Sequence, residues 1–379
     1  MSLRRDFVVL DGLRGVAALS IVLFHFHQAA PGLLGGAYLA VDLFFLLSGF
    51  VITHAYERRL LEGMSFTAFL RARVIRLWPL LALGCALGIG PFLMKAHTHQ
   101  RLWLAASIAP NFLLIPSPPG ASPERYLFPV DIPAWTLVFE ILANLAYAAV
   151  VKRLTTRVLV TVCVGLAVLS AGFAGYRGSL GGGDNWNTLF DGFLRVSMSY
   201  SAGVLLYRLR PWTWRTPPQL QALISVALMV IMVAGFQLGG WIHPKWAFEL
   251  LFVLAFSPLI VSAGSALVVT GRLGAFYGAL GFASYALYAL HDPLASYVTA
   301  FGRAAGIVSS VTDPRLICMK VVVVVAAAFL AAYAYDAPLR RWLTERLAGA
   351  GGPGQLIAAD PAASALRAAP TVEESVEKV

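Results

Sequence analysis

Charge is scarce in this chain. Of its 379 residues only 13% are charged, whereas 59% are hydrophobic, and the mean hydropathy is +0.74. About a quarter of the residues of a soluble globular domain are charged, so this composition excludes an ordinary soluble protein. The apolar runs reach the roughly 17–25 residues that a spanning helix needs, whereas the strands of a membrane barrel would be shorter and alternating. We therefore predict an all-α, polytopic integral membrane protein.

Cysteines and the common catalytic motifs are also few or absent. The three cysteines lie far apart in apolar segments, so we expect neither a disulfide framework nor a metal site. The chain has no Walker A loop, no Gly-x-Ser-x-Gly elbow and no His-Glu-x-x-His pair. The polar residues inside the apolar runs therefore become the candidates for chemistry.

The sequence predicts about ten spanning helices, which places both termini on one side of the membrane. With cytoplasmic termini, 20 of the 29 basic residues lie at the inner face, as the positive-inside rule requires. This topology accounts for most of the net charge of +10, so we expect membrane lipids and no nucleic acid as partners. The predicted spans are 13–30, 37–55, 77–94, 133–151, 158–176, 190–207, 219–238, 246–264, 280–300 and 316–336.

Two segments and the C-terminal end depart from this pattern. Basic and apolar residues alternate at helical spacing over 65–77, which predicts a short helix at the inner membrane surface. Residues 102–116 are too few to span comfortably and include Pro110, which predicts a partial or re-entrant helix. We divide the chain into a transmembrane domain at 1–345 and a disordered cytoplasmic tail, rich in Ala, Gly and Pro, at 346–379.

The first apolar run, LDGLRGVAALSIVLFHFH at 10–27, contains an arginine and histidines. A charged side chain near the centre of a membrane helix costs about 2.5–3.5 kcal/mol and usually faces a bundle interior or a cavity. Eleven residues separate Arg14 from His25, which places both within roughly 20° of one helix face, about 16 Å apart along the axis. We expect a cation at the inner edge and a titratable imidazole near mid-depth.

Two further spans contain acidic residues. Asp42 and Ser48 lie in the second span, where the alternative to a functional role is a helix-packing Ser-Gly notch at Ser48 and Gly49. Glu140 is the centre of three polar residues spaced four apart in the fourth span, which forms one polar stripe. We interpret the stripe as a cavity wall that begins just inside the outer surface; the alternative is that Glu140 only pairs with Arg195 or another buried base.

The ninth span and the inner arginines complete the candidate residues. Tyr288 and His291 share one face of the ninth span, although a lone membrane histidine is more often a helix-to-helix hydrogen-bonding group. Arg73 and Arg76 lie three residues apart on one helical face, with Arg71 nearby. Such a cluster suits a ligand with several phosphates; the alternative is an anchor for anionic lipids.

Five motifs, in order and at these separations, strongly resemble the membrane acyltransferase family 3 over residues 8–342. The motifs are LDGLRGVAALSIVLFHF, VDLFFLLSGFVI, RARVIRLWPL, PAWTLVFEI and GFASYALYALHDP. The resemblance implies a multi-pass enzyme of the bacterial cytoplasmic membrane that transfers an acyl group, usually acetyl, from cytoplasmic acyl-coenzyme A to a carbohydrate hydroxyl on the outer side. The fused esterase-like domain of some members is missing here, and Asp336 stands where the family has a glutamate, so we give Asp336 no specific role.

The resemblance also places the family's motifs on particular residues of this chain. The arginine-to-histidine motif falls on Arg14 and His25, and the basic R-x-x-R motif falls on Arg73 and Arg76. His25 would either deprotonate the sugar hydroxyl or accept the acyl group itself. We expect catalytic roles for His25, Glu140 and Asp42, acyl-coenzyme A binding by Arg14, Arg71, Arg73 and Arg76, and acceptor contacts from Ser48, Trp135, Tyr288 and His291.

The acceptor is left open by the sequence. Loops 117–133 and 178–188 are expected to select it, but their residues do not distinguish lipopolysaccharide, exopolysaccharide or peptidoglycan, or a non-sugar acceptor such as a lipid, antibiotic or peptide. A transporter is a further alternative. Secondary transporters are built from repeat-related halves with paired broken helices, and no such repeat is evident in the sequence.

Overall fold

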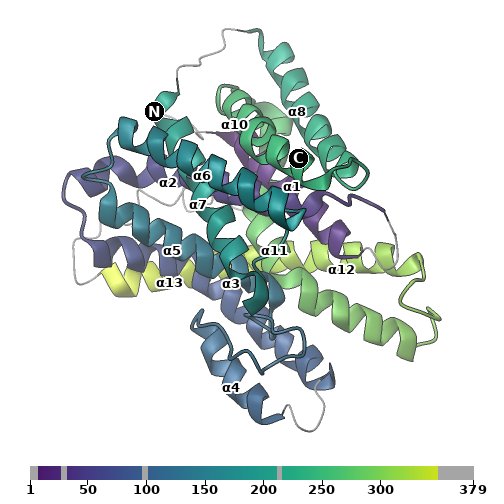
Figure 1. Ribbon diagram of the computed structural model, residues 1–379. Helices are drawn as coiled ribbons and strands as arrows, with labels where there is room; N and C mark the ends of the chain where they lie inside the picture. The colour runs from purple at the N-terminus through teal and green to yellow at the C-terminus, as the bar shows by residue number, and fades with distance from the viewer. Residues whose placement is uncertain (1–6, 27–31, 96–100, 211–215, 349–379) are drawn as a thin grey trace, which may run out of the picture.

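The computed structural model describes residues 7–26, 32–95, 101–210 and 216–348, and these form a bundle of helices (Figure 1). The main helices are α1 (Val8–His25), α2 (Ala40–Leu61), α3 (Phe66–Lys95), α4 (Arg101–Phe112), α5 (Trp135–Val150), α6 (Thr156–Arg177), α7 (Leu189–Leu209), α8 (Pro218–Leu238), α9 (Lys245–Leu251), α10 (Ser257–Ser265), α11 (Gly271–Ala304), α12 (Arg315–Leu330) and α13 (Ala337–Ala348). The short 3-10 turns are η1 (Ala37–Leu39), η3 (Ile132–Ala134) and η4 (Trp186–Thr188), and the π-helical turns are η5 (Phe252–Phe256) and η6 (Ala331–Asp336).

A helix lies at each of the ten predicted spans, but in the described part of the chain nine segments, not ten, are long and apolar enough to cross a membrane. The exception is α7. Its 21 residues include Asp191 and Arg195, which are buried in the bundle, and Arg208 near its end. α7 is long enough to cross a membrane but less apolar than the other nine segments, because it directs its polar residues into contacts with neighbouring helices.

The predicted surface helix at 65–77 and the predicted span at 77–94 are one continuous helix. α3 has 30 residues and contains both Pro79 and Pro91. At 1.5 Å per residue it is about 45 Å long, more than the roughly 30 Å of the hydrocarbon layer. The prediction of a separate surface helix was wrong because the arginines of this segment enter the bundle and the helix continues through Pro79.

The predicted partial helix at 102–116 is confirmed. α4 has 12 residues with Pro110 inside it, and it packs alongside α3 at one end of the molecule (Figure 1). The indole Nε1 of Trp78 in α3 donates a hydrogen bond to the carbonyl oxygen of Phe112, at 3.0 Å. The predicted tail is helical as far as Ala348 in α13, and from residue 349 it lies outside the described residues.

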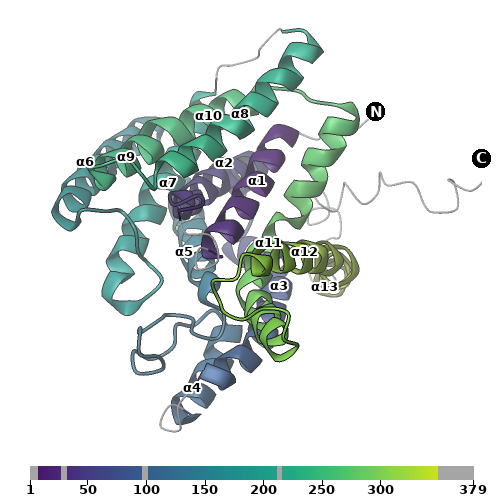
Figure 2. The same cartoon turned by 90° about the vertical axis from the view of Figure 1, so that its right-hand side faces the viewer.

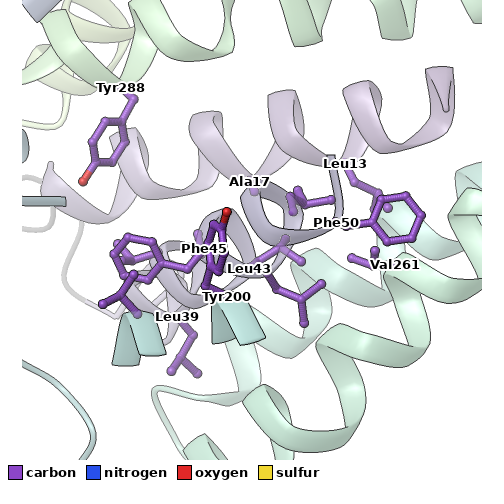
Figure 3. Packing of buried hydrophobic residues seen from close by; sticks show 14 of the residues in the cluster. Leu13, Ala17, Leu39, Leu43, Phe45, Phe50, Tyr200, Val261 and Tyr288 are labelled. Atoms are coloured by element: carbon purple, nitrogen blue, oxygen red, sulfur yellow. The ribbon is translucent and has the colours of Figure 1, made fainter. Parts of the chain in front are cut away.

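α1 is the central helix of the bundle, between α11 on one side and α2, α8 and α10 on the other (Figure 2). Small residues allow its close approach to α11: a Cβ on Gly15 would lie 2.5 Å from the Cβ of Leu280. On the other side, large apolar side chains fill the space between the helices (Figure 3). This group includes Leu13 and Ala17 of α1, Leu43, Phe45 and Phe50 of α2, Tyr200 of α7 and Val261 of α10.

α2 and α7 approach each other through paired glycines. A Cβ on Gly49 would collide with the carbonyl oxygen of Tyr200, and one on Gly203 would collide with the carbonyl oxygen of Leu46. Both obstacles are backbone atoms, which a rotamer change cannot move. The expected helix-packing notch of the second span therefore lies at Gly49, next to Ser48.

Gly49→Ala is expected to destabilise the protein by about 1–3 kcal/mol, because the added methyl group overpacks the α2–α7 contact. The measurement is thermal unfolding of the detergent-solubilised protein. Gly172→Ala in α6 is the matched control, since nothing lies within 4 Å of its added Cβ. Equal melting temperatures for the two variants would contradict the packing role of Gly49.

Candidate active site

Arg14 faces α11 and not the surrounding lipid. Its Nε donates to the hydroxyl oxygen of Ser284 at 3.0 Å, and its Nη2 donates to the carbonyl oxygen of Gly281 at 3.0 Å. The same Nη2 lies 2.9 Å from a carboxylate oxygen of Asp11, and 31% of the Arg14 side chain is exposed. Asp11, in α1 itself, thus supplies the counter-charge of Arg14, and the close approach of α11 supplies its other hydrogen-bond acceptors.

His25 also faces α11. Its Nδ1 lies 3.1 Å from Nε2 of His291 and 2.9 Å from the carbonyl oxygen of Ile21. Because Arg14 and His25 both contact α11, they share one face of α1, as their spacing predicts. α1 ends at His25, however, and Phe26 is in a turn, so His25 lies at the end of this helix. The remainder of the first predicted span, 27–30, lies outside the described residues.

The two histidines differ in exposure. His291 is fully buried in α11, whereas His25 is exposed. Nδ1 of His291 lies 2.7 Å from the carbonyl oxygen of Tyr288, one turn earlier in the same helix. Sequence reasoning placed His291 among the acceptor contacts, and the structure places it directly against His25.

Glu140 and Arg73 meet in the middle of the bundle. Nη2 of Arg73 lies 3.2 Å from Oε1 of Glu140, and the hydroxyl of Ser48 donates to the same oxygen at 2.8 Å. Arg76 and Glu140 are also close enough to Arg14 to interact with it electrostatically. We call Arg14, Ser48, Arg73, Arg76 and Glu140 the central polar cluster.

This arrangement changes the expected depth of Glu140. Its position in the fourth span placed it in the outer half, and the basic pattern at 65–77 placed Arg73 at the inner surface. Two atoms 3.2 Å apart lie at the same depth in the membrane, so Glu140 cannot be in the outer half while Arg73 is at the inner surface. The partner of Glu140 is Arg73, so the pairing with a buried base that we considered as the alternative is present, although the base is not Arg195.

The polar stripe of α5 does not form the continuous cavity wall that its spacing suggested. Thr136 lies 3.0 Å from the hydroxyl of Tyr288 in α11, and Asn144 accepts a hydrogen bond from Tyr200 in α7 at 2.9 Å. Glu140, between them, contacts α2 and α3. Each member of the stripe thus joins α5 to different neighbours.

Asp42 forms a fully buried ion pair with Arg195. Nη2 of Arg195 lies 2.7 Å from Oδ2 of Asp42, and Nε lies 3.2 Å from Oδ1. Arg195 also donates to the carbonyl oxygens of Gly182 and Tyr38, and its guanidinium lies 5.6 Å from the ring centroid of Trp135. These contacts give Asp42 and Trp135 structural partners that hold α2, α7 and the loop before α7 together.

The three inner arginines do not act as one group. Nη1 of Arg71 donates to the carbonyl oxygen of Leu347 at the end of α13, at 2.9 Å. Arg73 turns toward Glu140. Arg71 therefore links α3 to α13 through a hydrogen bond, while Arg73 and Arg76 belong to the central polar cluster.

The two loops expected to select the acceptor meet in space. Tyr126 and Asn185 form an isolated backbone bridge, and the amide of Leu127 donates to the carbonyl oxygen of Asp184 at 2.9 Å. The indole of Trp186 donates to the carbonyl oxygen of Ser117 at 2.9 Å. Loops 117–133 and 178–188 therefore form one ordered surface.

Sequence reasoning missed Asp131, at the end of the first of these loops. Its side chain is buried, and neither carboxylate oxygen has a hydrogen-bond partner among the described residues. Burial, with a smaller contribution from the charge of Asp292, raises the pKa of Asp131 well above its usual value. The sequence did contain a signal for this residue, because Asp131 directly precedes the Ile-Pro at the start of the fourth predicted span.

The chain is similar to known proteins over most of its length. An acyltransferase domain family model, acyltransferase 3, matches residues 7–333. A protein of Rhizobium radiobacter described as "Protein 2 in picA locus" is 39% identical over 176 residues, which cover 43% of this chain and 92% of that protein. No solved structure matches the chain. The chain therefore belongs to the acyltransferase 3 family and is a multi-pass membrane acyltransferase.

Proposed function

We propose that this enzyme transfers an acetyl group from cytoplasmic acetyl-coenzyme A to a hydroxyl group of an extracytoplasmic carbohydrate in the bacterial cytoplasmic membrane. The observation that supports this most is the shared orientation of Arg14 and His25 toward α11. A fixed cation and an imidazole, about 16 Å apart on one helix, suit a donor with an anionic head and a distant reactive end. Both termini then lie in the cytoplasm, as the distribution of basic residues favours.

The central polar cluster is the proposed site for the donor phosphates. Arg73 pairs with Glu140 and Arg14 pairs with Asp11, while Arg76 and Glu140 lie close enough to Arg14 to interact with it electrostatically. Three guanidinium groups thus meet two carboxylates here. The buried Nε of Arg73 has no hydrogen-bond partner among the described residues, so this guanidinium retains a donor for a ligand anion. Guanidinium groups bind phosphate through short charge-assisted hydrogen bonds.

His25 is the proposed catalytic residue. In direct transfer, its imidazole takes the proton of the acceptor hydroxyl while the hydroxyl oxygen forms a bond to the acyl carbon. The carbon–sulfur bond then breaks, and the departing thiolate of coenzyme A takes the proton from the imidazolium. In the covalent alternative, the imidazole attacks the acyl carbon, the carbon–sulfur bond breaks and the thiolate leaves with the proton of the imidazole. The acceptor hydroxyl then attacks the acyl-imidazole, and its proton returns to the departing imidazole.

The experiment that tests this function uses the purified protein in lipid vesicles with acetyl-labelled acetyl-coenzyme A and a surface-glycan extract. We expect release of the free thiol of coenzyme A and labelled ester on the glycan, both dependent on the added glycan. Movement of intact acetyl-coenzyme A across the vesicle without thioester cleavage would instead indicate a transporter. A labelled lipid or peptide product would instead identify a non-sugar acceptor and contradict the carbohydrate acceptor.

Arg73→Ala is expected to weaken donor binding, with an apparent affinity for acetyl-coenzyme A about tenfold or more lower, because a hydrogen bond to a charged group contributes about 1.5–3 kcal/mol. The comparison substrate is acetyl-pantetheine, which lacks the nucleotide phosphates and should bind wild type and variant alike. Arg58→Ala is the control, since Arg58 is an exposed arginine at the end of α2. Unchanged affinity for acetyl-coenzyme A in Arg73→Ala would contradict the assignment.

A further inference from the structure

The contact between His25 and His291 determines where the protons of both rings lie. A neutral imidazole has one nitrogen that donates and one that accepts, and the neighbouring groups select which is which. Three short contacts constrain this pair: His291 Nδ1 to the Tyr288 carbonyl oxygen at 2.7 Å, His25 Nδ1 to the Ile21 carbonyl oxygen at 2.9 Å, and His291 Nε2 to His25 Nδ1 at 3.1 Å. Both carbonyl oxygens can only accept a hydrogen bond.

Only one arrangement of neutral rings satisfies all three contacts. The proton of His291 lies on Nδ1 and is donated to Tyr288, which leaves the lone pair of its Nε2 directed at His25. The proton of His25 then lies on Nδ1, shared between the Ile21 carbonyl oxygen and that lone pair. The opposite arrangement would place a nitrogen lone pair against a carbonyl oxygen in both rings, which is repulsive.

We propose that His291 is a positioning residue that holds His25 in the Nδ1–H tautomer, so that Nε2 of His25 is the atom that takes the proton of the acceptor hydroxyl. This inference rests on the proposed function and specifies which nitrogen of His25 takes the proton. When Nε2 is protonated during transfer, Nδ1–H still donates to His291. A neutral, buried His291 accepts that hydrogen bond and stabilises the imidazolium, and the ring regains neutrality when the thiolate removes the Nε2 proton.

Three substitutions at position 291 separate positioning from packing. A glutamine can place an amide oxygen near the position of the imidazole Nε2 and accept from His25. An asparagine is shorter and can only reproduce the contact with the Tyr288 carbonyl oxygen, and a phenylalanine fills the volume without an acceptor. We expect His291→Asn and His291→Phe to lower kcat by about tenfold or more with little change in KM for acetyl-coenzyme A, and His291→Gln to retain most of kcat. Equal losses in all three folded variants would overturn the proposal.

The tautomer itself is observable without any assay. In protein labelled with 15N at histidine, the two ring nitrogens of His25 are assigned by difference from His25→Ala, and the Nδ1–H form is expected in wild type and in His291→Gln. His291→Phe removes one of the acceptors of Nδ1–H but leaves the Ile21 carbonyl oxygen, so it should raise the fraction of the Nε2–H form above that of wild type. An Nε2–H form of His25 in wild type would overturn the proposal. The expected spectrum without transfer from acetyl-coenzyme A would instead contradict the proposed substrates and leave the histidine pair intact.

Discussion

His25→Ala is expected to reduce acyl transfer by about 10²–10⁴-fold, the range attributed to a positioned general acid–base group. Alanine removes the nitrogen that takes the hydroxyl proton in the direct route and the nucleophile in the covalent route. The fold should persist, because His25 is the last residue of α1 and its side chain is exposed. The measurement is labelled ester formed per folded protein, with folding checked by thermal unfolding.

The matched control for this variant is His243→Ala. His243 is also an exposed histidine, in the loop before α9, and it belongs to neither the central polar cluster nor the histidine pair. It should transfer at the wild-type rate, so a loss confined to His25→Ala separates catalysis from a general effect of removing an imidazole. Normal transfer by His25→Ala would remove His25 from the mechanism.

The largest expected effect on stability belongs to the Asp42–Arg195 ion pair. Both side chains are almost fully buried, with 0% and 3% exposed, and the pair joins α2 to α7. Asp42→Ala would leave a guanidinium inside the bundle without its counter-charge. Breaking a buried pair in this way destabilises a protein by about 3–5 kcal/mol, because the remaining charge stays desolvated. Thermal unfolding of the detergent-solubilised protein measures the change.

An exposed ion pair provides the control for Asp42→Ala. Glu62 lies 3.5 Å from Arg58 at the end of α2, with both side chains largely exposed, and exposed pairs contribute about 0–1 kcal/mol. Glu62→Ala should therefore leave the melting temperature almost unchanged. If Asp42→Ala unfolded at the same temperature as Glu62→Ala, the structural role of Asp42 would be rejected and a catalytic role for Asp42 would again have to be considered.

The sequence predicted relationships within one helix better than those between helices. The shared face of Arg14 and His25 follows from helix geometry alone, since eleven residues bring the two side chains to nearly the same angle. The contact of Glu140 with Arg73 depends on how far α5 and α3 are shifted along the membrane normal. No property of either segment alone determines that shift.

The same distinction explains the other differences. Asp42 and Arg195 were each recognised as unusual in an apolar span, but their pairing depends on the α2–α7 contact at Gly49 and Gly203. Proline weakens the interior of a helix, which favours a helix boundary at Pro79, yet α3 continues through it. The position of His291 against His25 likewise required the packing of α1 on α11.

The most direct test of the account uses sealed inside-out membrane vesicles, in which the cytoplasmic face is outward. Acetyl-labelled acetyl-coenzyme A, which does not cross lipid, is added outside vesicles that contain surface glycan, and the label is followed into the lumen. The account predicts labelled ester on lumenal glycan with wild type and none above background with His25→Ala. Equal lumenal ester from both proteins, or ester formed only on glycan added outside, would contradict transfer across the membrane through His25.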